Sequence, residues 1–474
     1  MNLKIKEFLS NFSITLIANL LSMIVSSLVI LIVPAFISVA EYGYWQLYVF
    51  YCSYTSYFSL GLTDGVYIRN GGKKYEDLET AKIRSQYWFL FLLNILLTIG
   101  ITAFFFFQND NIDKIYIVFF ACLSAIIIIP RSLITMTMLS VNRIKENAII
   151  LIVDRSIYFV MIVLFFILKV NNFYFLILSD LLGQFISSIL AIFMCKELVF
   201  GKNKISLYEV LRESKINIAI GIKIVLAGLA SMLIVGIIRM GIEQNWGVEE
   251  FAKVSLTLSI CNLLLVFIKA ISVVIFPVLC NSKLDALKKI YSISKTSLGI
   301  VLLGLLIFYY PLKVILTFWL PKYGQSLLYM AFLFPISLYE SKTQLLINTY
   351  FKALRKENLL LFINVITVLL SFICSIISIN LLNSINLAIL SVVLLLGFRC
   401  YLSEFLLLKI LELKGVKDIF VEIVISFLFI LFNWSIGGFV GMALYILVYL
   451  VYLYIKREHV KNLIINIKNV LVKN

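Results

Sequence analysis

The chain has 474 residues, of which 62% are hydrophobic and 14% are charged, and its formal net charge is +16. A water-soluble fold of this size could not cover so much apolar surface with so few polar groups, which excludes a soluble enzyme or nucleic-acid-binding protein. The single histidine lies in the C-terminal tail, and the seven cysteines are isolated, so no spacing suits a metal site or histidine-based catalysis. The composition predicts an integral membrane protein that has no catalytic residues and is not an enzyme.

Apolar runs of about twenty residues, the length needed to cross a bilayer as a helix, recur along the whole chain. They do not alternate with polar residues, as the strands of a membrane barrel would. The run nearest the N-terminus is too long for a secretory signal and has no cleavage site after it, so it is predicted to be the first span. The sequence predicts an all-α protein with about fourteen transmembrane helices, at 12–33, 44–64, 86–107, 115–139, 148–169, 173–194, 218–240, 251–277, 297–317, 325–350, 359–381, 385–408, 418–433 and 436–455.

The basic residues are distributed unequally between the two sides of these predicted spans. If the N-terminus is cytoplasmic, 29 of the 41 Lys and Arg residues fall in cytoplasmic segments, and only Lys114, Lys169 and Lys322 fall in outer loops. Short cytoplasmic loops of membrane proteins are enriched in positive charge. The pattern therefore predicts an even number of spans and places both termini in the cytoplasm.

Two short matches suggest an internal duplication. Lys145-Glu146-Asn147 recurs as Lys356-Glu357-Asn358, 211 residues later, and Glu41 and Glu250 begin predicted spans 209 residues apart. Parallel repeats are typical of transporters, which bind substrates between their two halves. We therefore expect a six-helix lobe at 1–200, a second at 201–410, and a helix pair with a cytoplasmic tail at 411–474.

Polar residues recur at helical spacing within several predicted spans. Asp180 and Gln184 lie on one face of the sixth span, and Glu340 and Gln344 lie on one face of the tenth. Such stripes arise where helices pack closely, and also where they line a hydrated lumen. Asp64 lies between two glycines at the inner end of the second span, which fits either a gating hinge or a simple helix terminus.

Nine basic residues fall inside predicted spans, and four of them lie away from the span ends, where a charge costs about 2.5–3.5 kcal/mol on insertion scales unless it meets a partner or a cavity. These four are Arg131, Lys269, Lys342 and Arg399. They are candidates for binding a substrate anion; structural ion pairing with Asp180 or Glu340 is the alternative. The neighbouring Asp154 and Arg155 are expected to reach the cytoplasmic interface from the start of the fifth span.

The chain resembles the multidrug/oligosaccharidyl-lipid/polysaccharide exporter superfamily, and within it the Wzx-type O-antigen and polysaccharide flippases. The residues that carry the resemblance are Glu41-Tyr42-Gly43-Tyr44-Trp45, Leu60-Gly61-Leu62 and Asn142-Arg143-Ile144-Lys145-Glu146-Asn147. The helix arrangement of six, six and two is similar as well. These motifs are short, whereas the similarity in topology extends along the whole chain.

The resemblance implies a function in the bacterial inner membrane: moving an undecaprenyl-diphosphate-linked oligosaccharide from the cytoplasmic to the periplasmic face by alternating access. Turnover would be coupled to H⁺ or Na⁺, with no other cofactor. The four deep basic residues would contact the diphosphate, and the polar set Asp64, Asp180, Gln184, Glu340 and Gln344 would line the lumen or carry the coupling ion. Expected partners are membrane lipids, a polysaccharide polymerase and the chain-length machinery, with no nucleic acid.

Three other functions remain open from the sequence. A drug/cation antiporter of the same superfamily would have a lumen rich in carboxylates, whereas the deep charges here are mainly basic. A lipid II flippase would handle a similar anionic headgroup. A membrane O-antigen polymerase or ligase belongs to a different class and usually carries a large periplasmic loop, which this sequence lacks.

Overall fold

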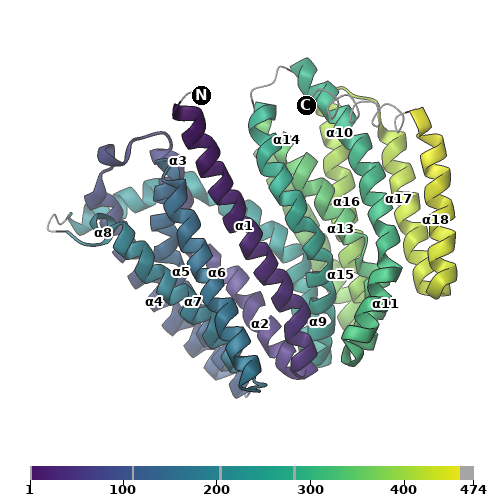
Figure 1. Cartoon of the computed structure of the whole chain (residues 1–474), viewed down its shortest axis with the longest axis horizontal. Helices are drawn as coiled ribbons and strands as arrows, with labels where there is room; N and C mark the ends of the chain where they lie inside the picture. Colours follow the sequence, from purple (N-terminus) through teal and green to yellow (C-terminus); the bar gives the residue numbers. More distant parts are fainter. Residues whose placement is uncertain (1–2, 109–110, 202–204, 281–283, 459–474) are drawn as a thin grey trace. The chain divides into compact units, whose positions relative to one another are not determined.

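The computed structural model describes residues 3–108, 111–201, 205–280 and 284–458, and these residues form helices and connections without a strand (Figure 1). Two compact units are present, Met1–Leu229 and Ala230–Asn474. Their boundary lies within α9 (Leu207–Cys280), which consists of two helices that meet at Gly247, where the backbone is not helical (φ 84°). The predicted first lobe ends earlier, at residue 200. The first part of α9 therefore belongs to the first unit.

The first unit is organised around one central helix. This helix, α5, packs against α2, α3, α4 and α7, and more than half of its most apolar stretch is buried, at 56%. The elements of the unit, followed by the first part of α9, are α1 (Leu3–Phe36), α2 (Val39–Thr55), η1 (Ser56–Ser59), α3 (Leu62–Asn70), η2 (Tyr75–Asp77), α4 (Thr80–Gln108), α5 (Ile112–Ser140), α6 (Ile144–Ile167), α7 (Phe173–Met194) and α8 (Lys196–Val199).

The second unit has its own central helix, α16, which packs against α12, α13, α15 and α17 and has 61% of its apolar stretch buried. The C-terminal pair α17–α18 contacts α10 in this unit. Its elements after α9 are α10 (Leu284–Leu305), η3 (Leu306–Phe308), α11 (Tyr309–Trp319), η4 (Pro321–Tyr323), α12 (Gly324–Leu333), α13 (Ile336–Lys342), η5 (Thr343–Ile347), α14 (Asn348–Ala353), α15 (Glu357–Ser375), η6 (Ile376–Leu381), α16 (Ile385–Ile410), α17 (Val416–Leu431), η7 (Phe432–Ile436) and α18 (Gly438–Ile455).

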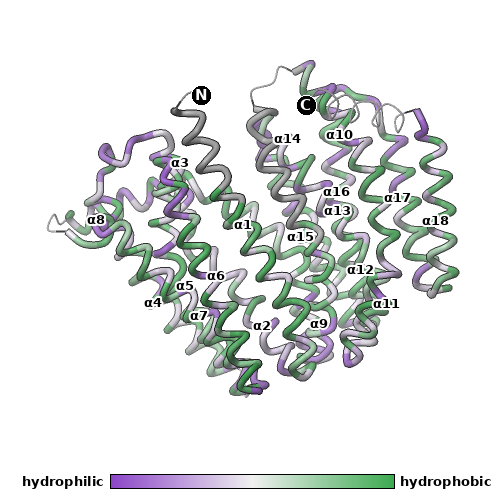
Figure 2. Tube along the Cα trace, viewed as in Figure 1, coloured by the Kyte–Doolittle hydropathy of each residue, from purple (hydrophilic) through white to green (hydrophobic). Residues whose placement is uncertain are grey.

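Within the described residues, eleven helical stretches are long and apolar enough to cross a membrane. The predicted second span corresponds mainly to α2, which has only 17 residues. α9 contains two predicted spans, one on each side of the non-helical Gly247, and the predicted span at 325–350 is divided among α12, α13, η5 and α14. Figure 2 shows hydrophobic residues along the helices and hydrophilic residues gathered around α3 and α8. The all-helical prediction is confirmed, while the count of fourteen and the side of the termini stay predictions.

The predicted helix at 44–64 is wrong at its C-terminal end. Leu60 and Gly61 both adopt left-handed backbone angles, with φ of 53° and 85°, and these angles end the α2–η1 segment. A separate helix, α3, then begins at Leu62 and places Asp64 in its first turn. Glycine adopts such angles without steric cost, whereas leucine does not, so the break is held by surrounding packing.

The turns after α5 and α14 have the same geometry, and the predicted duplication stays a prediction. Asn142 and Arg355 are both left-handed, with φ of 62° and 53°. The next residues, Arg143 and Lys356, each donate a backbone hydrogen bond of 2.8 Å to the carbonyl five residues earlier. This is the Schellman pattern at a helix C-terminus. The equivalent positions are thus 213 residues apart, so the two Lys-Glu-Asn tripeptides do not occupy equivalent places in their turns.

α3 and the first part of α9 are packed at backbone contact. A Cβ atom on Gly65 would lie 2.0 Å from the carbonyl oxygen of Asn217, and one on Gly221 would lie 2.0 Å from that of Gly61. Next to this contact, the Arg69 guanidinium donates a hydrogen bond of 2.8 Å to the Asn217 side chain. Glycine is required at these positions because the crossing leaves no space for a methyl group.

Replacing Gly65 with alanine is expected to destabilise the protein by about 1–3 kcal/mol, the usual cost of overpacking. Gly100→Ala is the matched control, because a Cβ on Gly100 meets nothing within 4 Å and alanine favours a helix by about 0.5–1 kcal/mol. Thermal unfolding of the detergent-solubilised proteins should show a lower Tm for the first variant only. Equal Tm values would contradict the close contact between α3 and α9.

Candidate functional site

The first unit contains a buried ion-pair network near the middle of its helices. Arg131 on α5 forms an ion pair with Asp154 on α6, with Nη1 2.8 Å from Oδ2, and it also donates to the hydroxyl of Ser187 on α7. Asp154 is only 1% exposed. Arg131 is therefore paired, but with Asp154 rather than with the sequence candidate Asp180.

Asp180 on α7 forms the second half of this network. Its Oδ2 accepts hydrogen bonds from the hydroxyl of Tyr48 (2.9 Å) and the amide of Gln184 (2.6 Å). Its Oδ1 lies 3.9 Å from Nη1 of Arg155, which completes an ion pair. Trp45 stacks on Tyr48, with ring centroids 5.4 Å apart, and covers the network with aromatic surface. Asp180 and Gln184 therefore lie on one polar face as predicted, and Asp180 on this face pairs with Tyr48 of α2 and Arg155 of α6.

Sequence reasoning missed Asp154 and Arg155 as members of this network. α6 begins at Ile144, so Asp154 lies ten residues into this helix, where it is buried against Arg131 of α5. This pairing was not expected, and the expectation that both side chains reach the cytoplasmic interface stays a prediction.

The second unit has a similar pair around Arg399 on α16. Its Nη2 forms an ion pair with Glu340 on α13, and its Nη1 donates a hydrogen bond of 2.7 Å to the hydroxyl of Ser231 on α9. Its Nε is buried and has no hydrogen-bond partner among the described residues. The Arg399 side chain is 3% exposed and that of Glu340 is 15% exposed. Gln344, predicted on the same face, lies in η5 and accepts a hydrogen bond of 3.4 Å from Asn348.

Lys342 belongs to a separate and more deeply buried cluster. Its ammonium lies between the carboxylates of Glu404 on α16, at 2.6 Å, and Glu422 on α17. Lys295 on α10 lies 3.0 Å from the other oxygen of Glu404 and donates to the carbonyl of Gly415. All four charged side chains are at most 6% exposed. The cluster joins four helices, including the C-terminal α17, and its two positive charges balance its two negative charges.

Of the four members, only Lys342 was predicted as a site residue. Lys295 falls in a predicted cytoplasmic segment, whereas Glu404 and Glu422 lie within the predicted spans 385–408 and 418–433. A buried lysine needs a counter-charge. The signal in the sequence was the presence of carboxylates inside other predicted spans, any of which could pair with Lys342.

The remaining two candidates differ in how far the structure describes them. Asp64 lies in the first turn of α3 and is partly exposed. The side chain of Lys269 lies outside the described residues. In the part of the chain that the structure describes, no group of three or more His, Cys, Asp or Glu side chains could hold a metal ion.

The Asn142–Asn147 motif forms a clip at the start of α6. Arg143 forms an ion pair with Glu146, with Nε 2.7 Å from Oε1, and its guanidinium lies 4.6 Å from the ring centre of Tyr75. Burial, together with the Cys195 thiol, raises the pKa of Tyr75 to about 12, so its hydroxyl stays neutral at physiological pH. This motif therefore anchors the η2 connection and does not extend the buried networks.

The electrostatic arrangement limits what these groups can do. Arg131, Lys342 and Arg399 are each paired with a carboxylate, and each network contains equal numbers of positive and negative charges. A substrate anion that binds such a basic group competes with the carboxylate that already holds it. Protonation or cation binding at the carboxylate would release the basic group. The networks are thus suited to linking anion binding to cation binding.

Several solved structures have the same fold. An inward-facing multidrug resistance MATE family transporter of the MOP superfamily matches with a TM-score of 0.65 at 10% identity, over 85% of this chain and 99% of that chain. The lipid II flippase MurJ, in an inward closed conformation, matches with a TM-score of 0.57 at 14% identity, over 95% and 99% of the two chains. A MOP superfamily transporter from Pyrococcus furiosus matches with a TM-score of 0.55 at 10% identity, over 85% and 96%.

No family model matches the sequence, and no curated protein matches it significantly. The similarity to the solved structures is therefore a similarity of fold at low sequence identity. It confirms the predicted resemblance in fold alone. The structures matched are transporters and a flippase, not enzymes.

Proposed function

We propose that this chain is a flippase that moves an undecaprenyl-diphosphate-linked oligosaccharide, the repeat unit of an O-antigen or capsule, from the cytoplasmic to the periplasmic face of a bacterial inner membrane by alternating access. The main support is the extent of the structural matches. The lipid II flippase covers 95% of the chain, whereas the MATE transporter covers 85%. The difference is about a tenth of the chain, which is close to the length of the α17–α18 pair.

Within this proposal, Arg399 and Arg131 are the residues best suited to hold the diphosphate. An arginine binds a phosphate through two parallel hydrogen bonds, and the buried Nε of Arg399 still lacks a partner among the described residues. Lys342 is less suited, because two carboxylates hold it at 1% exposure. Lys269 stays a candidate from its position in the sequence.

The same pairs offer a route for coupling to H⁺ or Na⁺. Glu340 competes with a phosphate for Arg399, so neutralising Glu340 with a proton or a sodium ion would free the guanidinium for the substrate. Asp180 could act in the same way beside Arg155 in the first unit. Gln184, Gln344 and Asp64 are proposed as further lumen or ion-binding groups. Collapsing the proton and sodium gradients separately tests this coupling; export that continues unchanged without either gradient would contradict it.

The favoured alternative is a drug/cation antiporter, because a MATE transporter gives a TM-score of 0.65. The proposed antiporter would require its carboxylates to meet a cationic drug, whereas Asp154, Glu340 and Glu422 are already bound by basic side chains. A lipid II flippase differs from our proposal only in the sugar and peptide of its cargo. A polymerase or ligase has no support from the structures matched.

Deleting the gene tests the proposed function directly. We expect one lipid-linked oligosaccharide to accumulate in the cytoplasmic leaflet and surface glycan to be lost, with recovery when the wild-type gene is restored. Mass spectrometry of extracted lipids identifies the glycan and names the cargo. Normal surface glycan with increased drug sensitivity would instead support the antiporter, and accumulation of lipid II would support the peptidoglycan alternative. A polymerase or chain-length protein is the expected functional partner.

A further inference from the structure

The first helix of α9 is much longer than one membrane span. From Leu207 to Trp246, the residue before the break at Gly247, it has 40 residues, which at about 1.5 Å per residue is a length of about 60 Å. The hydrocarbon core of a bilayer is about 30 Å thick and is crossed by about twenty residues. About half of this helix therefore lies outside the hydrocarbon core or along its surface.

One side of the start of α9 is packed against the first unit. Ser214, Asn217 and Gly221 are buried at spacings of three and four residues, which place them on one side of the helix. Gly221 is in close contact with Gly61, and the Asn217 amide donates a hydrogen bond of 3.2 Å to Gln86 on α4. This side is thus covered by protein, so any further contact of the helix uses the opposite side.

The opposite side carries a row of basic residues, which are Arg212, Lys215 and Lys223. All three are exposed, and none forms an ion pair within the part of the chain that the structure describes. Basic residues on the packed side behave differently, because Arg69 and Lys82 both pair with Glu213. Glu209 is the only exposed carboxylate between residues 207 and 224, so the exposed side has a surplus of two positive charges.

An apolar row lies beside the basic row. Ile216, Ile220 and Ile224 recur every four residues and are 38%, 36% and 52% exposed. Tyr208 and Leu211, nearer the start of the helix, are exposed as well. Unpaired lysine and arginine next to exposed apolar residues are typical of helices on a membrane surface, where the apolar residues meet acyl chains and the basic residues reach the headgroups.

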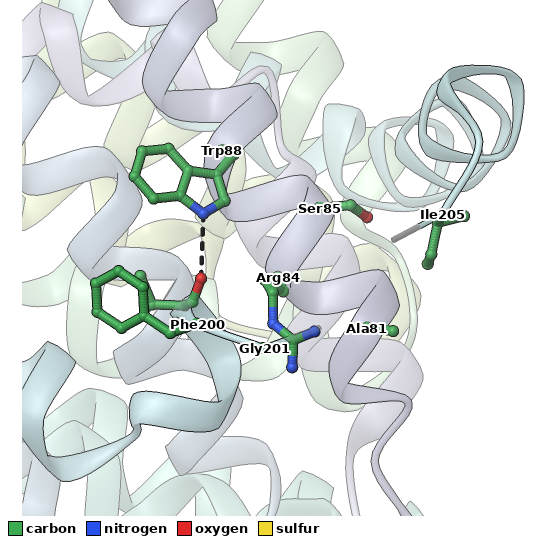
Figure 3. Close-up of a pocket in the computed structure, with 8 residues that line it drawn as sticks. Ala81, Arg84, Ser85, Trp88, Phe200, Gly201 and Ile205 are labelled. Carbon is green, nitrogen blue, oxygen red and sulfur yellow. Dashed lines mark hydrogen bonds between the residues drawn. The ribbon is translucent and has the colours of Figure 1, made fainter. Parts of the chain in front are cut away.

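Aromatic residues close to the start of α9 also have the character of a membrane interface. Ile205, two residues before α9, lies beside α4, which carries Trp88 (Figure 3). The indole of Trp88 is partly exposed and donates a hydrogen bond of 3.1 Å to the carbonyl of Val199, and the neighbouring Phe200 is exposed. Tryptophan collects at the level of the lipid headgroups. The start of α9 therefore lies near a residue type that is typical of this level.

We propose that the exposed side of α9 between residues 207 and 224 lies on the membrane surface and binds the headgroups of anionic phospholipids through Arg212, Lys215 and Lys223. The isoleucine row contacts the acyl chains of the same lipids. The surplus of positive charge favours an anionic phospholipid over a zwitterionic one. The proposal depends on the membrane location of the chain and not on the transported cargo, so it can fail while the proposed function holds.

The test titrates the full chain, freed of lipid in detergent, with phosphatidylglycerol or phosphatidylcholine and measures bound lipid by native mass spectrometry. We expect phosphatidylglycerol to bind at least about tenfold more tightly, because each basic side chain near an anionic lipid surface contributes about fivefold. The triple variant Arg212→Gln/Lys215→Gln/Lys223→Gln should lose this preference. An unchanged preference in this variant, or equal binding of the two phospholipids by the wild type, would overturn the proposal.

A matched control removes three exposed basic residues from the end of α14 and the turn after it, in the variant Lys352→Gln/Arg355→Gln/Lys356→Gln. This control should keep the preference for phosphatidylglycerol. Loss of the preference in both triple variants would mean that only the total charge matters, which contradicts a site on α9. A wild-type Tm of each variant in the absence of lipid shows that it is folded.

A further variant tests the apolar row. Ile216→Ser/Ile220→Ser keeps every charge, so it should weaken the binding of both phospholipids about fivefold or more while the preference for phosphatidylglycerol remains. A dimer that this variant abolishes would show that a second copy of the chain covers the exposed side, and it would overturn the proposal. Displacement of phosphatidylglycerol by equimolar undecaprenyl phosphate would also overturn it, because the surface would then belong to the substrate lipid.

Discussion

Replacing Arg399 with alanine is expected to abolish export of the lipid-linked glycan, while Glu340→Gln binds the diphosphate more tightly and uncouples export from the H⁺ or Na⁺ gradient. The alanine variant removes the guanidinium that we assign to the phosphate. The glutamine variant removes its competing carboxylate. The measurement is surface glycan in a deletion strain that carries each variant, normalised to the amount of folded protein in the membrane.

The double variant Arg399→Ala/Glu340→Ala separates substrate binding from structural pairing. Losing one partner of a buried pair leaves an uncompensated charge and costs about 3–5 kcal/mol, whereas losing both removes that penalty. If Arg399 binds the substrate, the double variant is folded but does not export. Export restored in the double variant would show that Arg399 serves only to neutralise Glu340. Arg131→Ala with Asp154→Ala provides the same comparison in the first unit.

Replacing Lys342 with methionine is expected to have the largest effect on stability. The change leaves Glu404 and Glu422 buried with only Lys295 to balance them, at a cost of about 3–5 kcal/mol. Because Glu422 is on α17, the loss should first loosen the contact of the C-terminal helix pair with its own unit. A lower Tm in detergent and faster proteolysis after α16 are the expected observations.

Two comparisons control this prediction. Lys352→Met removes an exposed lysine of α14. It should change the free energy of unfolding by less than about 0.5 kcal/mol and leave the Tm close to that of the wild type. Lys342→Met/Glu422→Gln restores charge balance, with Lys295 still paired to Glu404, and should recover most of the loss. A single variant as stable as the wild type would show that the cluster carries no net stabilisation.

The helices could be predicted wherever the residues of a single segment are enough to specify a transmembrane helix. Apolar runs of membrane-spanning length correctly indicated α1, α4, α5, α7 and the helices after α14, because each must satisfy its backbone polar groups within its own helix. The interruptions were less accessible. The break at Leu60 and Gly61 was not predicted, because it depends on the close approach of Gly61 to Gly221 of α9. The interruption after α12 falls at Pro335, a residue whose ring disfavours a helix interior and which therefore indicated a kink from the sequence.

The site was predicted in part. The basic residues were predicted, but their partners, which lie far away in the sequence, were mostly not. Arg131, Lys342 and Arg399 could be identified because a charge inside an apolar run is visible in the run itself. Their partners were not, since an ion pair depends on which faces of two helices meet. Glu340 was correctly named as the alternative partner of a deep basic residue, whereas Asp180 receives Arg155 and leaves Arg131 to Asp154.

By itself, the sequence determined that this is an all-helical membrane protein with deep basic residues. These are properties of single segments, because the hydrophobicity and charge of each segment decide whether it crosses the bilayer. Only the tertiary structure decided that the described deep basic residues are neutralised, and by which carboxylates. It also decided that the start of α9 belongs to the first unit, because the glycine contact with α3 is a fit between surfaces from distant parts of the chain.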